Sequence, residues 1–585
     1  MSLIDNFFDS SDKNLHVDKC EYYLGKISTV SSIFANIQIE NMSLLKYRFN
    51  QSDVLRPNTI NYHVLIDSNG TIFLGKVISS RINNTDNIHK AVIENNDDII
   101  YPNIEIKLMA MYDKNTFVLP GDLTVGIGDK AYICNDEAIK KYINSLEINK
   151  RDNQIEFSSF NLNEKKAIPF KISVDGLFNH HFMIVGATNS GKSTSALAIL
   201  DKYQKLKGKF LIIDPTGEYK DAFSKNEVNL KTIGKNLFLN TANLTDEQWI
   251  SLFRPNDNSQ VIELLEAIKK LKFVQYYKKH LNKVNLTEAE NRFIRNDILD
   301  CEGANQEQYK HLQIQWESDK VFNESFDINN LDKQIEKDSL KLSWNKGIKQ
   351  GTYQFDYFTY GANSWLIRKV KYLIKTYNLK ELFLNVDSKT QDKDFGETDK
   401  GKKILKDLNK EMLEFQGNDI SLYIRLNDSK FSIGLGQVIV DYISNFLLNH
   451  DMTKHPTLLF VDEVHRYALE KDAQDDFISP LATLAREGRK NGIFLFLTTQ
   501  SPKDVPTIVL NQIGTLLMHR LTGEYEIKAI NNFLNKDKLA QLSSLKSGEA
   551  ILTSVNLMQP VNLNIKASGR THYSNTPKLI KIKND

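Results

Sequence analysis

The stretch FMIVGATNSGKST, residues 182–194, places a short apolar strand directly before a glycine-rich turn. The turn reads Gly186-x-x-x-x-Gly191-Lys192-Ser193, and apolar residues at helical spacing follow it. This is the phosphate-loop pattern in its strand–loop–helix context. Its glycines let backbone N–H groups turn towards phosphate oxygens, and the N-terminus of the following helix favours an anion. A chance glycine-rich turn is the alternative, and the flanking strand and helix argue against it.

The loop predicts that the chain binds a nucleoside triphosphate. Lys192 can reach the β- and γ-phosphates, and the Ser193 hydroxyl can bind Mg²⁺. The predicted nucleotide-binding residues are Gly186, Ala187, Thr188, Asn189, Ser190, Gly191, Lys192, Ser193 and Thr194.

The 585 residues suffice for about two to four domains. Lysine and arginine total 75 against 73 aspartates and glutamates, so the net charge of +2 neither predicts nor excludes nucleic acid. The widely spaced Cys20, Cys134 and Cys301 predict reduced thiols. No apolar run approaches the ~18–20 residues of a membrane span, and the N-terminus lacks a signal-peptide pattern. We expect a soluble cytoplasmic protein with no membrane association.

The first 165 residues predict a small β-barrel with a role in assembly or docking. Short alternating apolar segments are separated by turn signals such as Ser68-Asn69-Gly70, which is the pattern of a barrel. The predicted strands are 24–30, 33–40, 63–67, 71–79 and 104–111.

From about Ile168 strands and helices alternate, which predicts an α/β core with a parallel sheet. Residues 166–257 form its first part and 419–555 its second. Between them, residues 258–418 are charged, Lys-rich and helix-periodic, for example over 261–281 and 364–377. We read them as an inserted helical subdomain. Its basic helices can face nucleic acid, although a solvated helix face is the more usual reading.

An acidic residue follows the second strand of the core. The strand 210–213 ends at Asp214, and Glu218 lies shortly after it. Ligands in such sheets bind beyond the carboxyl ends of the strands. Asp-Pro also initiates turns, so Asp214 is either a functional carboxylate or a turn cap. From the residues alone the two readings stand level.

A second acidic site follows the strand 457–461, which runs directly into Asp462 and Glu463. Asp462 would bind Mg²⁺, and Glu463 would polarise the attacking water. The strand 493–498 leads to Gln500, whose amide is placed to contact the γ-phosphate or the water. Arg486 and Arg489 lie just before it, where they either serve a neighbour's site or end a solvated helix.

Together these segments resemble the HerA-type hexameric ATPases, in the HerA/FtsK branch of RecA-like P-loop translocases. The matching segments are LGKISTV, VLPGD, HHFMIVGATNSGKST, IIDPTGEY, LLFVDEVHRYAL, LAREGRKNGIFLFLTTQSP and IVLNQIGTLLMHRLTG. The resemblance covers the barrel and the core but not most of the insertion. It implies a homo-hexameric ring that hydrolyses ATP with Mg²⁺ between adjacent subunits and draws duplex DNA through its pore.

The resemblance also implies residue roles. Lys192 and Ser193 would hold phosphates and Mg²⁺, Asp462 and Glu463 would be the metal-binding and water-activating pair, and Gln500 would be a sensor. Asp214 matches an acidic residue important for hydrolysis. The trans-acting arginine would be Arg489, or else Arg486, and residues 556–585 would form a tail that braces a neighbouring subunit. Two small departures, Asn189 where glycine is common and Val464 where alanine is usual, leave the required positions intact.

The first functional hypothesis is a DNA motor for a separate nuclease or sirtuin-like effector docked on the barrel. No nuclease-like cluster is evident, since His180 and His181 are expected in a loop rather than on a metal. The Asn-, Lys- and Ile-rich composition and the insertion favour a bacterial anti-phage defence protein. The alternative is an ATP-regulated ring scaffold that activates an effector without moving along DNA. A conjugative or secretion ATPase ranks last because no membrane segment is apparent.

Overall fold

The computed structural model describes most of the chain, in two compact units. The described residues are 4–8, 19–50, 53–55, 57, 60–68, 70–82, 88, 90, 93–94, 100–163, 166–281, 286–317, 322–344, 350–376, 379–384, 406–426, 433–467 and 479–573. The first unit holds residues 1–177 and 549–566, and the second holds 178–548 and 567–585.

A closed six-stranded barrel forms the N-terminal part of the first unit, which confirms the predicted barrel. Its strands follow the order β2-β1-β9-β5-β6-β7, and β7 closes the circle by pairing with β2. Every predicted strand is present. The strand β9, between β1 and β5, is additional, because its four residues are too few to show a pattern. The strands are β1 (Tyr23–Val30), β2 (Phe34–Gln38), β5 (His63–Ser68), β6 (Thr71–Ile82), β7 (Pro102–Asp113) and β9 (Lys130–Ile133).

Four further strands of the first unit come from both ends of the chain. β10 (Gln154–Asn163) pairs with β11 (Lys166–Ser173) and also with β26 (Val561–Ile565), which in turn pairs with β25 (Glu549–Ser554). The domain boundaries predicted at residues 165/166 and 555/556 separate β10 from β11 and β25 from β26, whereas these strands pair with one another. Pairing between strands so distant in sequence leaves no local signal.

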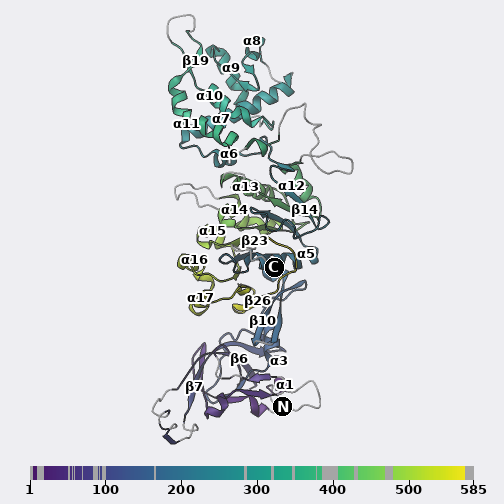
Figure 1. Cartoon of the computed structure of the whole chain (residues 1–585), viewed down its shortest axis with the longest axis vertical. Helices are drawn as coiled ribbons and strands as arrows, with labels where there is room; N and C mark the ends of the chain where they lie inside the picture. The colour runs from purple at the N-terminus through teal and green to yellow at the C-terminus, as the bar shows by residue number, and fades with distance from the viewer. Residues whose placement is uncertain are drawn as a thin grey trace, which may run out of the picture. The chain divides into compact units, whose positions relative to one another are not determined.

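The second unit contains a parallel sheet with the order β24-β12-β23-β22-β13-β21-β14. Two of its strands, β14 and β23, are labelled in Figure 1. The strands β12, β13 and β22 are mostly apolar and buried along their whole length, as expected for a sheet covered on both faces. The strands are β12 (Phe182–Val185), β13 (Lys209–Asp214), β14 (Val228–Thr232), β21 (Ser421–Arg425), β22 (Thr457–Val461), β23 (Ile493–Thr499) and β24 (Thr515–Met518). Together with the helices between them, they confirm the predicted α/β core.

The helical insertion lies between β14 and β21 in the chain. These two strands pair with each other, and β14 is the outermost strand of the sheet, so the insertion does not interrupt the strand order. Both helices expected from periodicity are present, and a core around Phe273, Leu312 and Trp316 holds this region together. Its main helices are α7 (Asn258–Lys279), α9 (Gln306–Trp316), α10 (Leu331–Lys337), α11 (Tyr357–Thr376) and α12 (Leu408–Gln416).

Within the described residues, no helix is both long enough and apolar enough to cross a bilayer. All three cysteines lie in the described part and none forms a disulfide; Cys134 and Cys301 are buried, whereas Cys20 is exposed.

Candidate active site

The strand order brings the predicted site residues to one edge of the parallel sheet. The phosphate loop follows β12, Gln500 follows β23, Asp462 and Glu463 follow β22, and Asp214 ends β13. These four strands are consecutive neighbours and run parallel, so their carboxyl ends meet at the same edge. That edge is where ligands bind in open α/β sheets.

The phosphate loop is built tightly enough to require its glycines. A Cβ on Gly186 would lie 2.5 Å from Ser190 Oγ and 2.7 Å from His519 Cβ, so no larger residue fits. Gly191 has a φ of 108° and caps α5 (Lys192–Lys205), whose N-terminus therefore opens onto the loop. Asn189 has a φ of 61°, a left-handed conformation that asparagine tolerates, which explains its presence where glycine is common.

The loop fits a phosphate ligand on two further counts. The Ser190 hydroxyl is buried and has no hydrogen-bond partner among the described residues. Unpaired buried hydroxyls are unusual in proteins and point to a missing partner. The first backbone N–H groups of α5 add partial positive charge at the same place.

A charged hydrogen-bond network links the loop to the acidic pair. Lys192 Nζ donates to Glu463 Oε1, and both side chains are largely buried. Gln500 Nε2 also donates to Glu463 Oε1, at 2.6 Å, while the Thr188 hydroxyl donates to Gln500 Oε1 at 2.7 Å. Burial alone would raise the pKa of Glu463, but the charge and hydrogen bond of Lys192 outweigh it and hold that pKa below its usual value.

Glu463 is held in an uncommon backbone conformation. Its φ of 50° places a long side chain in the left-handed region, at a cost of roughly 1–3 kcal/mol. The Thr498 hydroxyl accepts from Glu463 N at 3.0 Å and donates to Asp462 Oδ1 at 2.5 Å, so one side chain of β23 positions both acids. His465 Nδ1 lies 3.1 Å from the Thr499 hydroxyl and 3.3 Å from Glu463 Oε2.

Asp462 has the electrostatic character of a cation ligand. Its side chain is buried, and burial followed by the charges of Asp214 and Glu463 raises its pKa. A divalent cation would relieve this repulsion between carboxylates. The Ser193 hydroxyl, in the first turn of α5, is an oxygen ligand of the type Mg²⁺ prefers, so the donor set fits this ion.

Asp214 is completely buried and organises the loop that follows it. Its Oδ1 accepts hydrogen bonds from the backbone N–H groups of Thr216 and Gly217 at 2.9 and 2.7 Å. Its Oδ2 accepts from Tyr219 N at 3.0 Å and from the Tyr423 hydroxyl at 2.7 Å. These contacts are those of the turn-capping reading, and a role in hydrolysis stays a prediction.

Arg486 and Arg489 lie at the amino ends of the strands, opposite to the carboxyl ends where the phosphate loop lies. Arg486 ends α14 (Pro480–Glu487), Arg489 follows in a 3-10 turn, and both precede β23. Arg489 donates to Asn179 O at 3.2 Å and contacts His180 Nδ1 at 2.9 Å, just before β12 begins. Both arginines are exposed. Neither reaches the phosphate loop of its own chain, so each remains a candidate only for a neighbouring subunit.

His181 is a buried structural histidine. Its Nδ1 accepts from Leu495 N at 3.0 Å, which leaves the proton on Nε2 to be donated to Ala485 O at 2.8 Å. Burial lowers its pKa to about 4. With both ring nitrogens occupied, the side chain is not arranged as a metal ligand.

Several residues of this edge escape detection in the sequence. His519 follows β24 and its Nε2 lies 2.8 Å from the Ser195 hydroxyl, behind the loop. Thr498 and Tyr423 hold the acidic residues, but an isolated threonine or tyrosine in an apolar strand reads as ordinary core. The one available signal is the position of Thr498, which lies near the end of β23 and so just before the predicted Gln500.

The segment after β26 reaches this edge within its own unit. His572 Nε2 lies 3.3 Å from the Thr194 hydroxyl, and the Tyr573 hydroxyl donates to Asp221 at 2.7 Å. Arg570 donates to Asp201 and Glu227. Residues 574–585, which hold much of the predicted brace, lie outside the described residues, and the brace itself stays a prediction.

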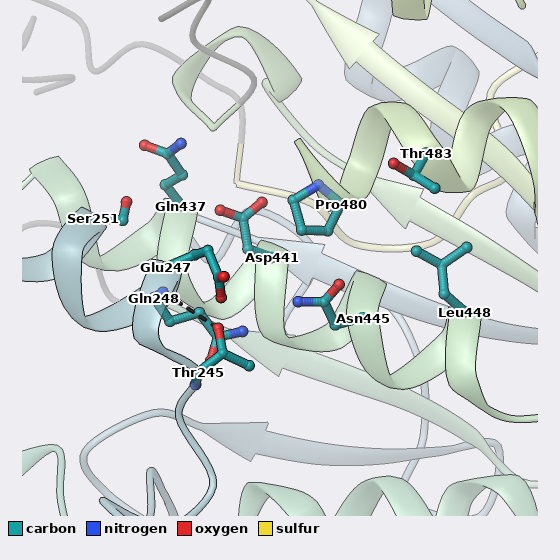
Figure 2. Close-up of a pocket in the computed structure, with 10 residues that line it drawn as sticks. All are labelled: Thr245, Glu247, Gln248, Ser251, Gln437, Asp441, Asn445, Leu448, Pro480 and Thr483. Atoms are coloured by element: carbon teal, nitrogen blue, oxygen red, sulfur yellow. Dashed lines mark hydrogen bonds between the residues drawn. The ribbon is translucent and has the colours of Figure 1, made fainter. Parts of the chain in front are cut away.

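A separate polar cavity of about 210 Å³ lies between α6 (Asp246–Phe253), α13 (Ile433–Asn449) and α14 (Figure 2). Gln437, Asp441 and Asn445 line it from α13, and Glu247 lines it from α6. None of the predicted site residues is among its lining residues. Its acidic character is unsuited to a phosphate, so the nucleotide site belongs to the sheet edge.

A phosphate loop, an acidic pair two strands away and an amide on the strand between them define a P-loop ATPase with a RecA-like core. Two sequence families match the chain: the helicase HerA central domain over residues 160–349 and the helicase HerA-like C-terminal domain over residues 437–556. The chain belongs to the HerA-type ATPases. The first match extends well into the insertion, further than the motif resemblance reaches.

Curated relatives are similar over most of their length. The DNA double-strand break repair helicase HerA of Saccharolobus solfataricus is 22% identical over 510 residues, which cover 85% of each chain. The protein of the same name from Sulfurisphaera tokodaii is 25% identical over 434 residues, covering 71% of this chain and 70% of its own. Among solved structures, VirB4 of Thermoanaerobacter pseudethanolicus matches with a TM-score of 0.46 and 13% identity, over 72% of this chain and 98% of that one.

Proposed function

We propose that the chain is an ATP-hydrolysing motor that works with Mg²⁺ as a homo-hexameric ring and translocates duplex DNA for a partner nuclease or effector. The observation that carries this proposal is the Lys192–Glu463–Gln500 network at the sheet edge. The similarity to HerA-named helicases supports DNA as the track.

Each residue of the network has a stated task. The phosphate loop and Lys192 bind and orient the triphosphate, and Ser193 and Asp462 hold Mg²⁺. When bound, Mg²⁺ neutralises charge that develops on the phosphate oxygens. Glu463 accepts the proton of the attacking water. Gln500 donates to Glu463 and accepts from Thr188, so it couples the carboxylate to the phosphate loop.

The position of the arginines supports a ring. Charge on a transferring phosphoryl group is commonly stabilised by an arginine, supplied in cis or in trans. Arg489 and Arg486 are exposed and lie away from the phosphate loop of their own chain, so either one would act in trans. An active site is then complete only between two subunits, and Arg489 is our first choice.

The experiment is the ATPase rate of the purified full chain, with and without linear duplex DNA, across a salt series. A motor gives several-fold stimulation that fades with salt, because phosphate contacts release counterions. The matched control is Glu463→Gln, which removes hydrolysis and leaves the protein able to bind DNA. A rate indifferent to DNA at every salt concentration contradicts the motor.

A second candidate is a ring scaffold whose barrel docks a nuclease or sirtuin-like effector under ATP control. Exposed apolar side chains on the first unit favour a docking role: Leu119, Leu123 and Ile127 are 51%, 56% and 76% exposed within one short loop. Such groupings mark protein contacts more often than isolated residues do. DNA-independent ATPase, together with effector binding that Ile127→Asp abolishes, distinguishes this candidate.

The setting of this activity is also a proposal. The Asn-, Lys- and Ile-rich composition and the insertion support bacterial anti-phage defence in the cytoplasm. Protection of cells against phage that is lost with Lys192→Ala tests this setting.

A further inference from the structure

Helix α11 of the insertion carries an ordered stripe of aromatic and cationic side chains. Phe358, Trp365 and Tyr372 recur every seven residues, and a second series, Gly361, Arg368 and Lys375, recurs with the same period three residues later. Residues spaced by three and four lie on one face of a helix. Both series therefore run side by side along the helix, with about 10.5 Å between successive aromatics.

This stripe faces away from the rest of the insertion. Phe358, Trp365 and Tyr372 are 85%, 54% and 53% exposed. The opposite face of α11 is buried through Leu366 and Val370, and its principal partner is α10. All three aromatic side chains are therefore more than half exposed.

The charge of the stripe is of one sign. α11 contains Arg368, Lys369, Lys371 and Lys375 and no acidic residue. Lys369 is used inside the fold, where it donates to Arg254 O at 2.6 Å. Arg368 is held by Ser364 in its own helix, through Nε to O at 3.1 Å, which keeps the guanidinium beside the aromatic row.

The spacing argues against a helical protein partner. The two series occupy the a and d positions of a heptad, and a helix that packs there needs apolar residues at both. Here the d positions are Gly361, Arg368 and Lys375, so none of them is a large apolar residue and two are positively charged. A ligand that offers flat apolar faces and negative charge in alternation suits it better.

We propose that the α11 stripe, defined by Phe358, Trp365, Arg368, Tyr372 and Lys375, binds single-stranded nucleic acid. Unpaired bases stack on the three aromatic side chains, and Arg368 and Lys375 contact the phosphates between them. The bases of a duplex are stacked on one another and cannot take these positions. The stripe is therefore a site for an unpaired strand or end, separate from the duplex track proposed above.

The stripe lies outside both sequence-family matches, which cover residues 160–349 and 437–556. It is a property of this chain's own insertion, and it does not rest on the motor being correct.

The test is the anisotropy of a fluorescein-labelled oligothymidine of about 20 nucleotides, titrated with the full chain. Trp365→Ala and Tyr372→Ala are each expected to weaken binding about tenfold, since stacking contributes about 1–3 kcal/mol per base. Tyr525→Ala is the matched control, because Tyr525 is a 73% exposed tyrosine on another helix. The double variant Arg368→Glu/Lys375→Glu is expected to lower the slope of log affinity against log salt by about 1.4.

Tryptophan fluorescence gives an independent readout. Trp249 and Trp316 are buried, so Trp344 and Trp365 are the exposed reporters. Quenching by the oligothymidine is expected to disappear in Trp365→Phe and to persist in Trp344→Phe. Thermal stability and basal ATPase rate are measured in every variant and are expected to stay unchanged, as for most surface substitutions.

Three results overturn the proposal. The first is an unchanged oligothymidine affinity in both aromatic variants, and the second is an equal loss of affinity for a blunt duplex at the same concentration. The third is a variant with unchanged oligothymidine affinity that has a changed assembly mass or has lost a protein partner. Failure of the motor proposal is detected by a different measurement, the wild-type ATPase rate, which duplex DNA would then not stimulate.

Discussion

Lys192 of the phosphate loop donates a hydrogen bond to Glu463 at the end of β22, and both side chains are buried. The same ammonium group is the one that a phosphate loop directs at the β- and γ-phosphates. The two uses of Lys192 compete. We expect binding of the triphosphate to draw Lys192 away from Glu463 and to leave the carboxylate free to accept a proton.

Glu463→Gln is expected to abolish hydrolysis and preserve ATP binding. The amide cannot accept a proton, which removes the roughly 10²–10⁴-fold contribution of a general base. It also removes the negative charge that holds Lys192, so ATP affinity should be equal to or tighter than that of the wild type. Turnover and the affinity of a fluorescent ATP analogue measure the two effects. Lys192→Ala is the contrast, since it should lose both binding and turnover; wild-type turnover in Glu463→Gln contradicts the site.

Arg489→Ala is expected to lower turnover by roughly 10³-fold or more without weakening ATP binding, as for other trans-acting arginines. Mixing it with Glu463→Gln subunits should restore part of the activity, because each variant supplies what the other lacks at a shared interface. ATPase rates of mixtures at several ratios measure this rescue. Arg486→Ala, tested in the same way, separates the two arginines. Absence of rescue with either partner argues against a site between subunits.

Asp214→Asn is expected to destabilise the second unit by about 1–3 kcal/mol, because its amide nitrogen would face donors rather than acceptors. All five hydrogen bonds of this carboxylate come from the loop and from Tyr423. Tyr423→Phe removes one of them and should cost about 1 kcal/mol. Thermal unfolding followed with ATPase rates distinguishes the roles. An Asp214→Asn protein with wild-type stability and no turnover would support a direct part in hydrolysis instead.

Arg570→Ala is expected to lower both thermal stability and ATP affinity. Arg570 is a partly buried arginine that joins Asp201 of α5 to Glu227, and its loss leaves Asp201 buried with Lys205 as its remaining cation. The matched control is Lys566→Ala, since Lys566 forms an exposed pair with Glu156 that contributes little. Equal effects of the two substitutions would contradict a specific role for Arg570.

His181 makes stability depend on pH in a defined direction. Its pKa is lowered to about 4 in the folded protein, against a usual value near 6.5, so the unfolded chain binds the proton more tightly. The stabilisation is complete above pH 6.5 and is lost as pH falls towards 4. Between pH 7 and 5 the wild type should lose roughly 2 kcal/mol relative to His181→Asn, which keeps a donor and tolerates the φ of 54°. Thermal scans at both pH values, showing parallel losses, would contradict this.

The helices and strands and the chemistry of the phosphate loop can be derived from the sequence alone. Gly186, Gly191 and Lys192 have a fixed local spacing, and apolar runs such as 457–461 mark buried strands through short-range periodicity. The barrel strands and the two insertion helices are visible for the same reason. These features depend on residues close together in the chain, so they can be predicted without knowing what lies next to them.

Which distant residues come into contact depends on the tertiary structure. The order β12-β23-β22-β13 depends on pairing between distant strands, and it alone brings Lys192 to Glu463 and sends Arg489 to the opposite edge. The pairing of β26 with β10, the closure of the barrel by β2 and β7 and the burial of His181 have the same origin. Burial and long-range pairing are set by the whole fold, and no local pattern encodes them.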